Sequence, residues 1–426
     1  MNGSRFACVT LALCIVRLSA TSAVPDLKLV HVLFAHKLYA PREDQKAERE
    51  SLPRLLSYEY FISARKNMSN TSNLNMYNLG VHLRKIYSGF LGDGLQSYEP
   101  TKMRSTEYAL SILSAQLVNA GLWPPTEEQM WMTGLNWQPM PANYMELKED
   151  VLMLGSLCPN FISRMNEVLE TAEMRETLSQ YQPLFDYLSY YTERNISTPS
   201  DVALLYASLE TMADQDEMLP HWARDVFPHG TMYNVTLSEY DLLSATLLQR
   251  QLNGGTFLAE IVGNSLKYMS GEIPENRKMM LYSGDGRNIA GVLRNLDLWS
   301  PHIPNEAAAL IFELYLDNDT DTYGIKINYY TGVDETTIAL SLPNCTEICP
   351  LQTLLDVVFE LIPQNPRALC GWITENSTPG AKDADPLSLQ KNNSSDSSGS
   401  ANWCGSGGLI FNLTLLNLFS LVLAVR

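Results

Sequence analysis

The sequence predicts an α/β fold in which a helical block interrupts an alternation of strands and helices. Short, mostly apolar runs at residues 27–34 and 278–282 have the character of buried strands. Each is followed along the chain by a segment whose apolar residues recur at helical spacing. Residues 146–250 contain several amphipathic helical patterns and few strand signals. This order favours an α/β domain with a helical insertion.

The individual elements follow from local patterns. Residues 78–90 place apolar side chains at helical spacing, and residues 103–106 precede a second helical run. Ser105 or Thr106 is the expected N-cap of that run, so Arg104 is expected to open it. After the strand at 278–282, a helix is expected over 288–296. Finally, residues 307–316 and 323–330 flank a polar turn and predict a hairpin.

Composition restricts the function classes. Of the 426 residues, 45% are hydrophobic and 18% are charged, which is enough apolar material for a large folded core. The formal net charge is −17, and no block of Lys and Arg runs along the chain. Nucleic acid is therefore not an expected partner.

Both ends of the chain look like targeting segments. Residues 1–23 combine Arg5, an apolar run and a small-residue end, as a cleavable secretory signal does; a retained anchor is the alternative. At the other end, a Ser/Asn/Gly-rich linker at 386–408 precedes an apolar tail at 409–426. That layout is typical of a GPI-attachment signal, with a single membrane-spanning helix as the alternative. The folded part is then 24–385, and the expected location is the cell surface, or alternatively secretion or the lysosome.

The cysteines and sequons agree with an oxidising compartment. Four cysteines lie in the folded part, Cys158, Cys345, Cys349 and Cys370, and they allow three pairings. The close pair Cys345 and Cys349 favours a short-loop disulfide over a zinc site, so no metal is expected. Glycosylation is expected at sequons spread along the chain, at Asn67, Asn70, Asn195, Asn234, Asn318, Asn344, Asn376, Asn392 and Asn393.

Candidate site residues follow the two predicted strands. His36 and Lys37 come after the first strand, and Asp285 and Arg287 after the second. The carboxyl ends of strands form the ligand-binding edge of an open α/β sheet. An imidazole nucleophile with surrounding cations is what phosphoryl transfer needs, because the cations neutralise the phosphate oxygens.

At these positions the sequence resembles the histidine acid phosphatases, the branch with prostatic, lysosomal and insect venom acid phosphatases. The likeness extends from about residue 27 to 370 and includes several short motifs: Arg104-Ser105-Thr106, Leu135-Asn136-Trp137-Gln138-Pro139, Tyr282-Ser283-Gly284 and Leu342-Pro343-Asn344-Cys345. The resemblance implies a three-layer α/β/α fold with a mixed sheet and a smaller helical cap. It also implies the disulfides Cys158–Cys370 and Cys345–Cys349, a homodimer, and no cofactor.

The family's catalytic motifs are degenerate in this chain. In Arg-His-Gly-x-Arg, the phosphohistidine-forming His is kept as His36. Ala35 replaces the first Arg, Lys37 the Gly and Tyr39 the second Arg. In Ser-Gly-His-Asp, the phosphate-binding His is Asp285 and the proton-donating Asp is Gly286. The family's distant phosphate-binding Arg is matched to Arg104. Two of six catalytic positions are therefore kept.

Two main hypotheses follow. The first is a family member with impaired or absent phosphatase activity that acts as a binding or interaction protein. The second is a working acid phosphatase in which His36 is the nucleophile and Arg104 holds phosphate, with Lys37, Asp285 and Arg287 as displaced helpers. A third interpretation, binding of a non-phosphate small molecule, is allowed because Ala35 and Tyr39 make the pocket less cationic.

Overall fold

The computed structural model describes residues 24–37, 68–332 and 336–372. The predicted signal peptide, the linker and the C-terminal tail lie outside these residues, as do Tyr39 and the sequons at Asn67, Asn376, Asn392 and Asn393. Within the described part of the chain, no helix is long and apolar enough to cross a membrane.

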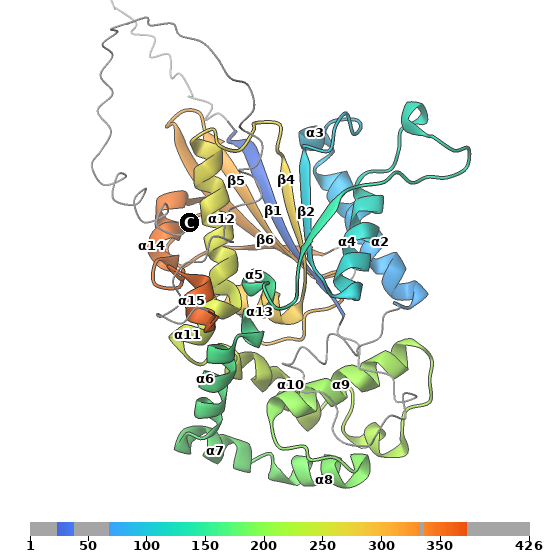
Figure 1. Cartoon of the computed structure of the whole chain (residues 1–426), viewed down its shortest axis with the longest axis vertical. Helices are drawn as coiled ribbons and strands as arrows, with labels where there is room; N and C mark the ends of the chain where they lie inside the picture. Colours follow the sequence, from blue (N-terminus) through green and yellow to red (C-terminus); the bar gives the residue numbers. More distant parts are fainter. Residues whose placement is uncertain (1–23, 38–67, 333–335, 373–426) are drawn as a thin grey trace, which may run out of the picture.

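An eight-stranded mixed sheet forms the centre of the molecule (Figure 1). Its strands run in the order β3-β2-β4-β1-β5-β6-β7, with β8 paired to β6. The first four are parallel to one another, and β5, β6 and β7 are antiparallel to their neighbours. The strands are β1 Asp26–His36, β2 Thr101–Thr106, β3 Ala142–Met145, β4 Met279–Asp285, β5 Ala309–Asp317, β6 Thr322–Tyr330, β7 Thr337–Leu340 and β8 Cys349–Pro350.

Helices cover both faces of the sheet and form a separate group beyond one end of it. The α-helices are α2 Asn70–Ile86, α3 Ser88–Leu91, α4 Ala109–Leu122, α5 Val151–Leu154, α6 Pro159–Leu169, α7 Ala172–Ser179, α8 Gln182–Thr192, α9 Pro199–Asp214, α10 Thr231–Leu242, α11 Leu247–Arg250, α12 Thr256–Met269, α13 Gly286–Asn295, α14 Leu351–Val358 and α15 Pro366–Cys370. Short 3-10 turns lie at Glu127–Gln129, Gly155–Leu157 and His221–Asp225, and a π-type turn at Gln251–Gly255.

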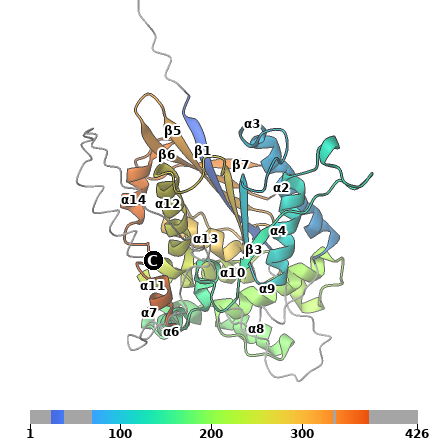
Figure 2. The same cartoon turned by 45° about the horizontal axis from the view of Figure 1, so that its top comes forward.

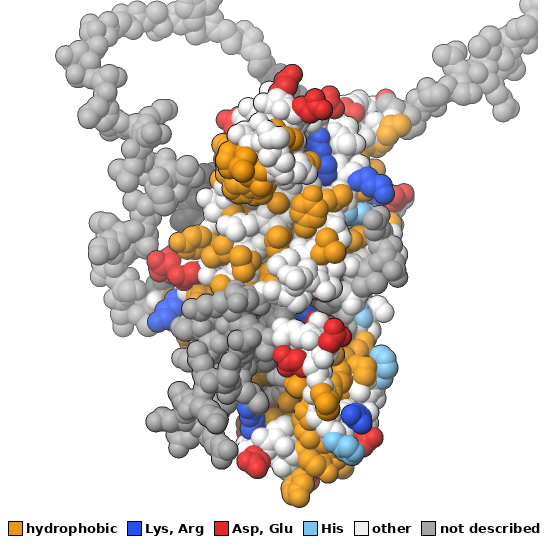
Figure 3. Space-filling view, turned by 90° about the vertical axis from the view of Figure 1, so that its right-hand side faces the viewer, with side chains coloured by type: hydrophobic (Ala, Val, Ile, Leu, Met, Phe, Trp, Pro, Cys, Tyr) orange, Lys and Arg blue, Asp and Glu red, His pale blue; other side chains and the backbone are white. Residues whose placement is uncertain are grey.

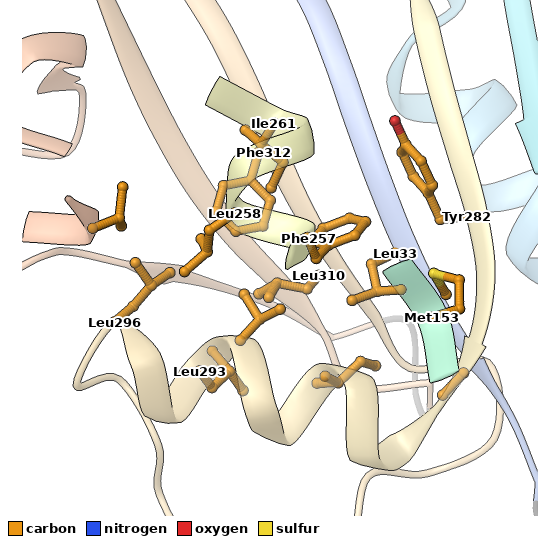
Figure 4. Close-up of a cluster of buried hydrophobic side chains, with 14 of the residues drawn as sticks. Leu33, Met153, Phe257, Leu258, Ile261, Tyr282, Leu293, Leu296, Leu310 and Phe312 are labelled. Atoms are coloured by element: carbon orange, nitrogen blue, oxygen red, sulfur yellow. The ribbon is translucent and has the colours of Figure 1, made fainter. Parts of the chain in front are cut away.

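The layers follow from alternation along the strands. In β1, Leu29 and Leu33 belong to a buried cluster with residues of α12, α13 and α14, part of which is drawn in Figure 4. Val30, Val32 and Phe34 belong to a second buried cluster with residues of α2 and α4. Because successive side chains of a strand point to opposite faces, β1 is buried on both sides. The three-layer α/β/α architecture and the mixed sheet are confirmed.

Two glycines allow α2 and α4 to pack closely. A Cβ atom at Gly80 would lie 2.2 Å from the carbonyl oxygen of Val118, and one at Gly121 would lie 2.1 Å from that of Tyr77. Only glycine fits at such a contact between helix backbones. The two helices therefore pack as one closely spaced pair on this face of the sheet.

The helices α8, α9 and α10 have a core of their own. Leu188, Val202, Leu205 and Val235 are buried together there, apart from the two clusters on the sheet. Figures 1 and 2 both show this group, the cap, beyond the end of the sheet where β1 and β4 finish. The cap therefore lies over the carboxyl ends of these strands.

Several predictions from the sequence can be compared with these elements. The hairpin is present as β5 and β6, and both disulfides form, Cys158–Cys370 and Cys345–Cys349. The predicted helix start at Arg104 is wrong, because residues 101–106 form β2 and α4 begins later, after Tyr108, without a side-chain cap. The described sequon asparagines are all exposed: Asn70, Asn195, Asn234, Asn318 and Asn344.

Candidate active site

His36 and Asp285 lie side by side at the carboxyl edge of the sheet. β1 and β4 are parallel neighbours, and their register pairs His36 with Asp285, the last residue of each strand. Both residues are buried, with 4% and 5% of their surface exposed. The two predicted strand ends therefore lie together at the carboxyl edge of the sheet, where ligands bind in open α/β sheets.

Asp285 is also the N-cap of α13. Its Oδ1 accepts hydrogen bonds from the backbone N–H of Arg287 at 2.8 Å and from Nε of the same residue at 3.4 Å. Its Oδ2 accepts from Arg287 Nη2 at 2.7 Å. The capping box is completed by Asn288, whose Oδ1 accepts from the Asp285 N–H at 2.9 Å. Carboxylate and guanidinium thus form a buried pair, locked at the start of the helix.

The charge of Asp285 follows from this geometry. Burial alone would raise the pKa of its carboxyl, but the Arg287 guanidinium and the hydrogen bonds that Arg287 donates hold that pKa below its usual value. Asp285 is therefore ionised over the whole physiological range. A negative charge is fixed next to the imidazole of His36.

His36 itself is held as a neutral ring. Its Nδ1 lies 3.1 Å from the backbone carbonyl oxygen of Lys37. Burial lowers the pKa of the imidazole, although the nearby Asp285 acts in the opposite direction. A neutral ring that donates Nδ1–H to this carbonyl has its lone pair on Nε2, which is the arrangement of a nucleophile. The ring of Tyr108 packs beside it, at 5.4 Å between centroids.

The cap adds a buried acid, Glu239 of α10, which the sequence does not reveal as a site residue. Its side chain is almost fully buried, and its Oε1 has no hydrogen-bond partner within the described structure. Burial raises the pKa of this carboxyl to about 7, with the Arg287 charge opposing the rise and the Asp285 charge adding to it. In the sequence, a buried glutamate in an amphipathic helix looks the same as a glutamate on the solvent-exposed face of that helix.

Lys37 is turned toward acids of the cap and of the loop before β5. Its Nζ forms an ion pair with Asp214 at the end of α9. Burial disfavours the ammonium, but the charges of Glu210, Asp214 and Glu306 outweigh that effect and raise the pKa of Lys37. The lysine is therefore charged and already neutralised by carboxylates, which weakens it as a phosphate ligand.

Arg104 lies on β2, which neighbours β4 on the side away from β1. Its position in β2 is in register with Tyr282, three residues before Asp285 in β4, or about 10 Å below the sheet edge. Its Nη2 lies 2.6 Å from Oδ1 of Asp150, a fully buried carboxylate that caps α5. Its register with Tyr282 places Arg104 on the face of the sheet that carries Tyr282 and Tyr108, the ring that packs beside His36. Among the described contacts Arg104 pairs with Asp150 and not with His36, Asp285 or Arg287, and its role as a phosphate ligand stays a prediction.

The site as a whole is rich in carboxylates. Two cations, Lys37 and Arg287, are each paired with an aspartate, and further acids surround them. Within the described residues, no group of three or more His, Cys, Asp or Glu side chains is arranged to hold a metal ion. The arrangement offers a buried neutral imidazole next to an internal ion pair. The described residues do not offer the cluster of unpaired cations that would neutralise a phosphate.

Comparisons with known proteins agree with the fold. A family model described as "Histidine phosphatase superfamily (branch 2)" matches residues 41–330. The venom acid phosphatase Acph-1 of Apis mellifera is 34% identical over 345 residues, 81% of this chain and 88% of that protein. The prostatic acid phosphatase of Homo sapiens is 29% identical over 320 residues, 72% of this chain and 79% of that protein. The apo phytase of Hafnia alvei is similar in fold, with a TM-score of 0.57 at 15% identity, over 81% of this chain and 98% of that one.

Proposed function

The chain belongs to the histidine phosphatase superfamily (branch 2), and on that premise we propose that it is an acid phosphatase homologue with impaired or absent phosphatase activity, acting as a binding or interaction protein. The observation that carries this proposal is the Asp285 carboxylate at the N-terminus of α13, held by the backbone N–H and the guanidinium of Arg287. In proteins generally, helix N-termini and guanidinium groups are common ligands of phosphate. Here an internal carboxylate takes the place of the substrate's anion.

The negative charge beside His36 and the missing proton donor at Gly286 also support impaired activity. A phosphate dianion next to His36 would meet the ionised Asp285, and like charges at this distance repel strongly in a buried site. The residue after Asp285 is Gly286, which has no side chain to protonate a leaving group. Loss of one preorganised donor typically costs about 10²–10³ in rate, and loss of a general acid about 10²–10⁴.

The test is hydrolysis of para-nitrophenyl phosphate from acid to neutral pH by the full-length protein, produced through the secretory pathway of cultured cells. The matched variant is His36→Ala, which removes the nucleophile position. We expect the same rate from both proteins. A rate that falls to background only in His36→Ala would overturn the proposal.

The second candidate is a working acid phosphatase with a rebuilt site. The observation in its favour is the neutral His36 ring, whose Nδ1 faces the Lys37 carbonyl and leaves Nε2 as the attacking atom. In this candidate Nε2 bonds to phosphorus as the P–O bond to the alcohol breaks, and Asp285 is the acid that gives the leaving oxygen its proton. Such a proton transfer needs an acid whose pKa lies near the working pH, whereas Arg287 lowers that of Asp285. Turnover lost in His36→Ala and in Asp285→Asn would support this candidate.

For the location, we propose the secretory pathway with a GPI anchor at the surface. Two disulfides and relatives named as venom, prostatic and lysosomal phosphatases agree with the secretory pathway. The anchor rests on the sequence of the tail alone. Release from cell membranes by a phosphatidylinositol-specific phospholipase C is the expected result, and retention in the membrane fraction would contradict it.

A further inference from the structure

Four aromatic residues form a cluster on the surface of the cap. Tyr187, Tyr190 and Tyr191 lie within four residues of one another on α8, and Trp222 lies in the 3-10 turn His221–Asp225. The ring of Tyr191 is central, since its centroid lies 4.8 Å from that of Tyr187 and 5.1 Å from that of Tyr190. The Tyr191 and Trp222 rings are nearly parallel, with 19° between their planes and 6.3 Å between their centroids. These four side chains form one surface, the aromatic face.

The aromatic face is ordered and open to solvent. The Tyr187 hydroxyl donates to the Trp222 carbonyl at 2.9 Å and so joins α8 to the turn. Tyr190 and Tyr191 expose 78% and 48% of their surface, and neither belongs to the buried core of the cap. Figure 3 shows hydrophobic side chains gathered at the lower end of the molecule, where the cap lies. Exposed aromatic area of this kind marks an interaction site.

The sequon at Asn195 is tied to the helix that carries this face. The backbone N–H of Ile196 donates to the Ser189 hydroxyl at 3.0 Å, and that hydroxyl donates to the Ile196 carbonyl at 3.3 Å. Ser189 directly precedes Tyr190 in the last turns of α8. Asn195 is exposed. A glycan on its side chain would therefore leave the protein beside the end of α8, close to Tyr190.

A neutral sugar has the chemistry that this face would bind. One side of a pyranose ring presents C–H groups, which pack against aromatic rings, and its edge presents hydroxyls. Tyrosine and tryptophan combine an apolar ring with a polar group that forms hydrogen bonds. All four side chains of the aromatic face are uncharged, so they do not attract an ionic partner. An N-linked glycan begins with neutral sugars, and the sequon at Asn195 lies at the edge of this face.

We propose that the glycan on Asn195 folds back over the aromatic face, with its first sugars packed on the rings of Tyr190 and Tyr191. In the attachment step, the Asn195 side-chain nitrogen bonds to C1 of the first sugar and loses a proton, and the pyrophosphate of a lipid-linked oligosaccharide donor leaves. The face is then shielded by carbohydrate, and a protein partner docks elsewhere. This inference is independent of the chemistry at His36, which lies at the end of β1.

The test is hydroxyl-radical oxidation of the full-length protein from cultured cells, read residue by residue by mass spectrometry, which also shows whether Asn195 carries a glycan. Ser197→Ala removes the sequon and keeps Asn195, and the matched control Ser197→Thr keeps the sequon. We expect oxidation of Tyr190 and Tyr191 to rise about threefold or more in Ser197→Ala, because a bulky glycan no longer covers them. Tyr98, which is 53% exposed elsewhere, should not change.

Removal of the glycan from the folded wild type by a peptide N-glycosidase gives a second measurement that needs no variant. Oxidation of Tyr190 and Tyr191 should rise there as well, again without a change at Tyr98. The melting temperature should fall on deglycosylation of the wild type and fall less in Tyr191→Ala, since the two changes remove the same contact. An unglycosylated Asn195, equal oxidation of both tyrosines with and without the glycan, or an undiminished fall in Tyr191→Ala would each overturn the proposal.

Discussion

Two buried Arg–Asp pairs of this molecule have nearly the same construction and different consequences. In each, an aspartate caps the start of a helix and pairs with an arginine: Asp285 with Arg287 at α13, and Asp150 with Arg104 at α5. The nitrogen–oxygen distances are 2.7 and 2.6 Å. One pair lies beside His36 at the sheet edge, and the other supports the sheet below it.

The difference lies in how completely each carboxylate is satisfied. Both oxygens of Asp285 accept from Arg287, and its pKa is held below the usual value despite its burial. Asp150 uses Oδ1 for Arg104 and for the Met153 N–H, while its Oδ2 and the Nη1 of Arg104 have no partner in the described structure. Burial outweighs Arg104 there and raises the pKa of Asp150. An aspartate whose two oxygens both accept from one arginine thus keeps a negative charge at the site. An aspartate with one unpartnered oxygen is not held ionised in the same way.

The largest expected effect is a difference in unfolding free energy between variants of the two pairs. Asp150→Ala should lower the free energy of unfolding by about 3–5 kcal/mol, because it removes a cap and leaves a largely buried Arg104 without its partner. Asp285→Ala should cost less, since Glu239 remains close enough to Arg287 to compensate its charge. Chemical denaturation with the disulfides intact measures both. Equal losses, or a larger loss in Asp285→Ala, would show that Glu239 provides no compensation.

Glu239 should also make stability depend on pH. Burial raises its folded-state pKa to about 7, above the ordinary value of 4.5 for a glutamate. Its contribution to stability is therefore fully present below about pH 4.5 and is lost as the pH rises to about 7. Between these values the unfolding free energy of the wild type should fall by about 3 kcal/mol relative to Glu239→Gln, which cannot titrate. A difference between the two proteins that stays constant with pH would mean that Glu239 is solvated.

A smaller effect tests the link between the two pairs. Asn288 accepts from the Asp285 N–H at 2.9 Å and donates from Nδ2 to the carbonyl of Met153, in the helix that Asp150 caps, at 2.7 Å. Asn288→Ala should destabilise the protein by about 1–2 kcal/mol. Asn276→Ala is the control, because that side chain is exposed and bonds only to the surface residue Glu99 among its described contacts. A loss no larger than the control's would show that the two caps are independent.

The sequence predicts the scaffold better than the site for physical reasons. β1 and β4 are buried on both faces, so they appear as apolar runs, and the residues that follow them are expected at the carboxyl edge of the sheet, where His36 and Asp285 are found. β2 has little apolar signal, because Thr101, Ser105 and Thr106 are buried through tertiary contacts rather than by their own hydrophobicity. Its polar residues therefore predict a helix cap, and Arg104 is misplaced with them.

Other site residues lack any local signal. Glu239 and Asp214 reach the site from cap helices about two hundred residues after His36 in the sequence. Asp150 lies at the head of a helix of one turn, where an acid is an ordinary surface feature. Their roles depend on how the cap folds over the sheet, which residue patterns within each helix do not encode.

The central claim is that the Asp285 carboxylate occupies the position of a substrate anion, and titration calorimetry with inorganic phosphate tests it most directly. The proteins compared are the wild type, Asp285→Asn and, as the matched control in the other pair, Asp150→Asn. We predict that Asp285→Asn binds phosphate about tenfold or more tightly than the wild type, because the Arg287 guanidinium is released and a buried negative charge is removed. Asp150→Asn should match the wild type. Phosphate binding by the wild type that Asp285→Asn leaves unchanged or weakens would contradict the claim.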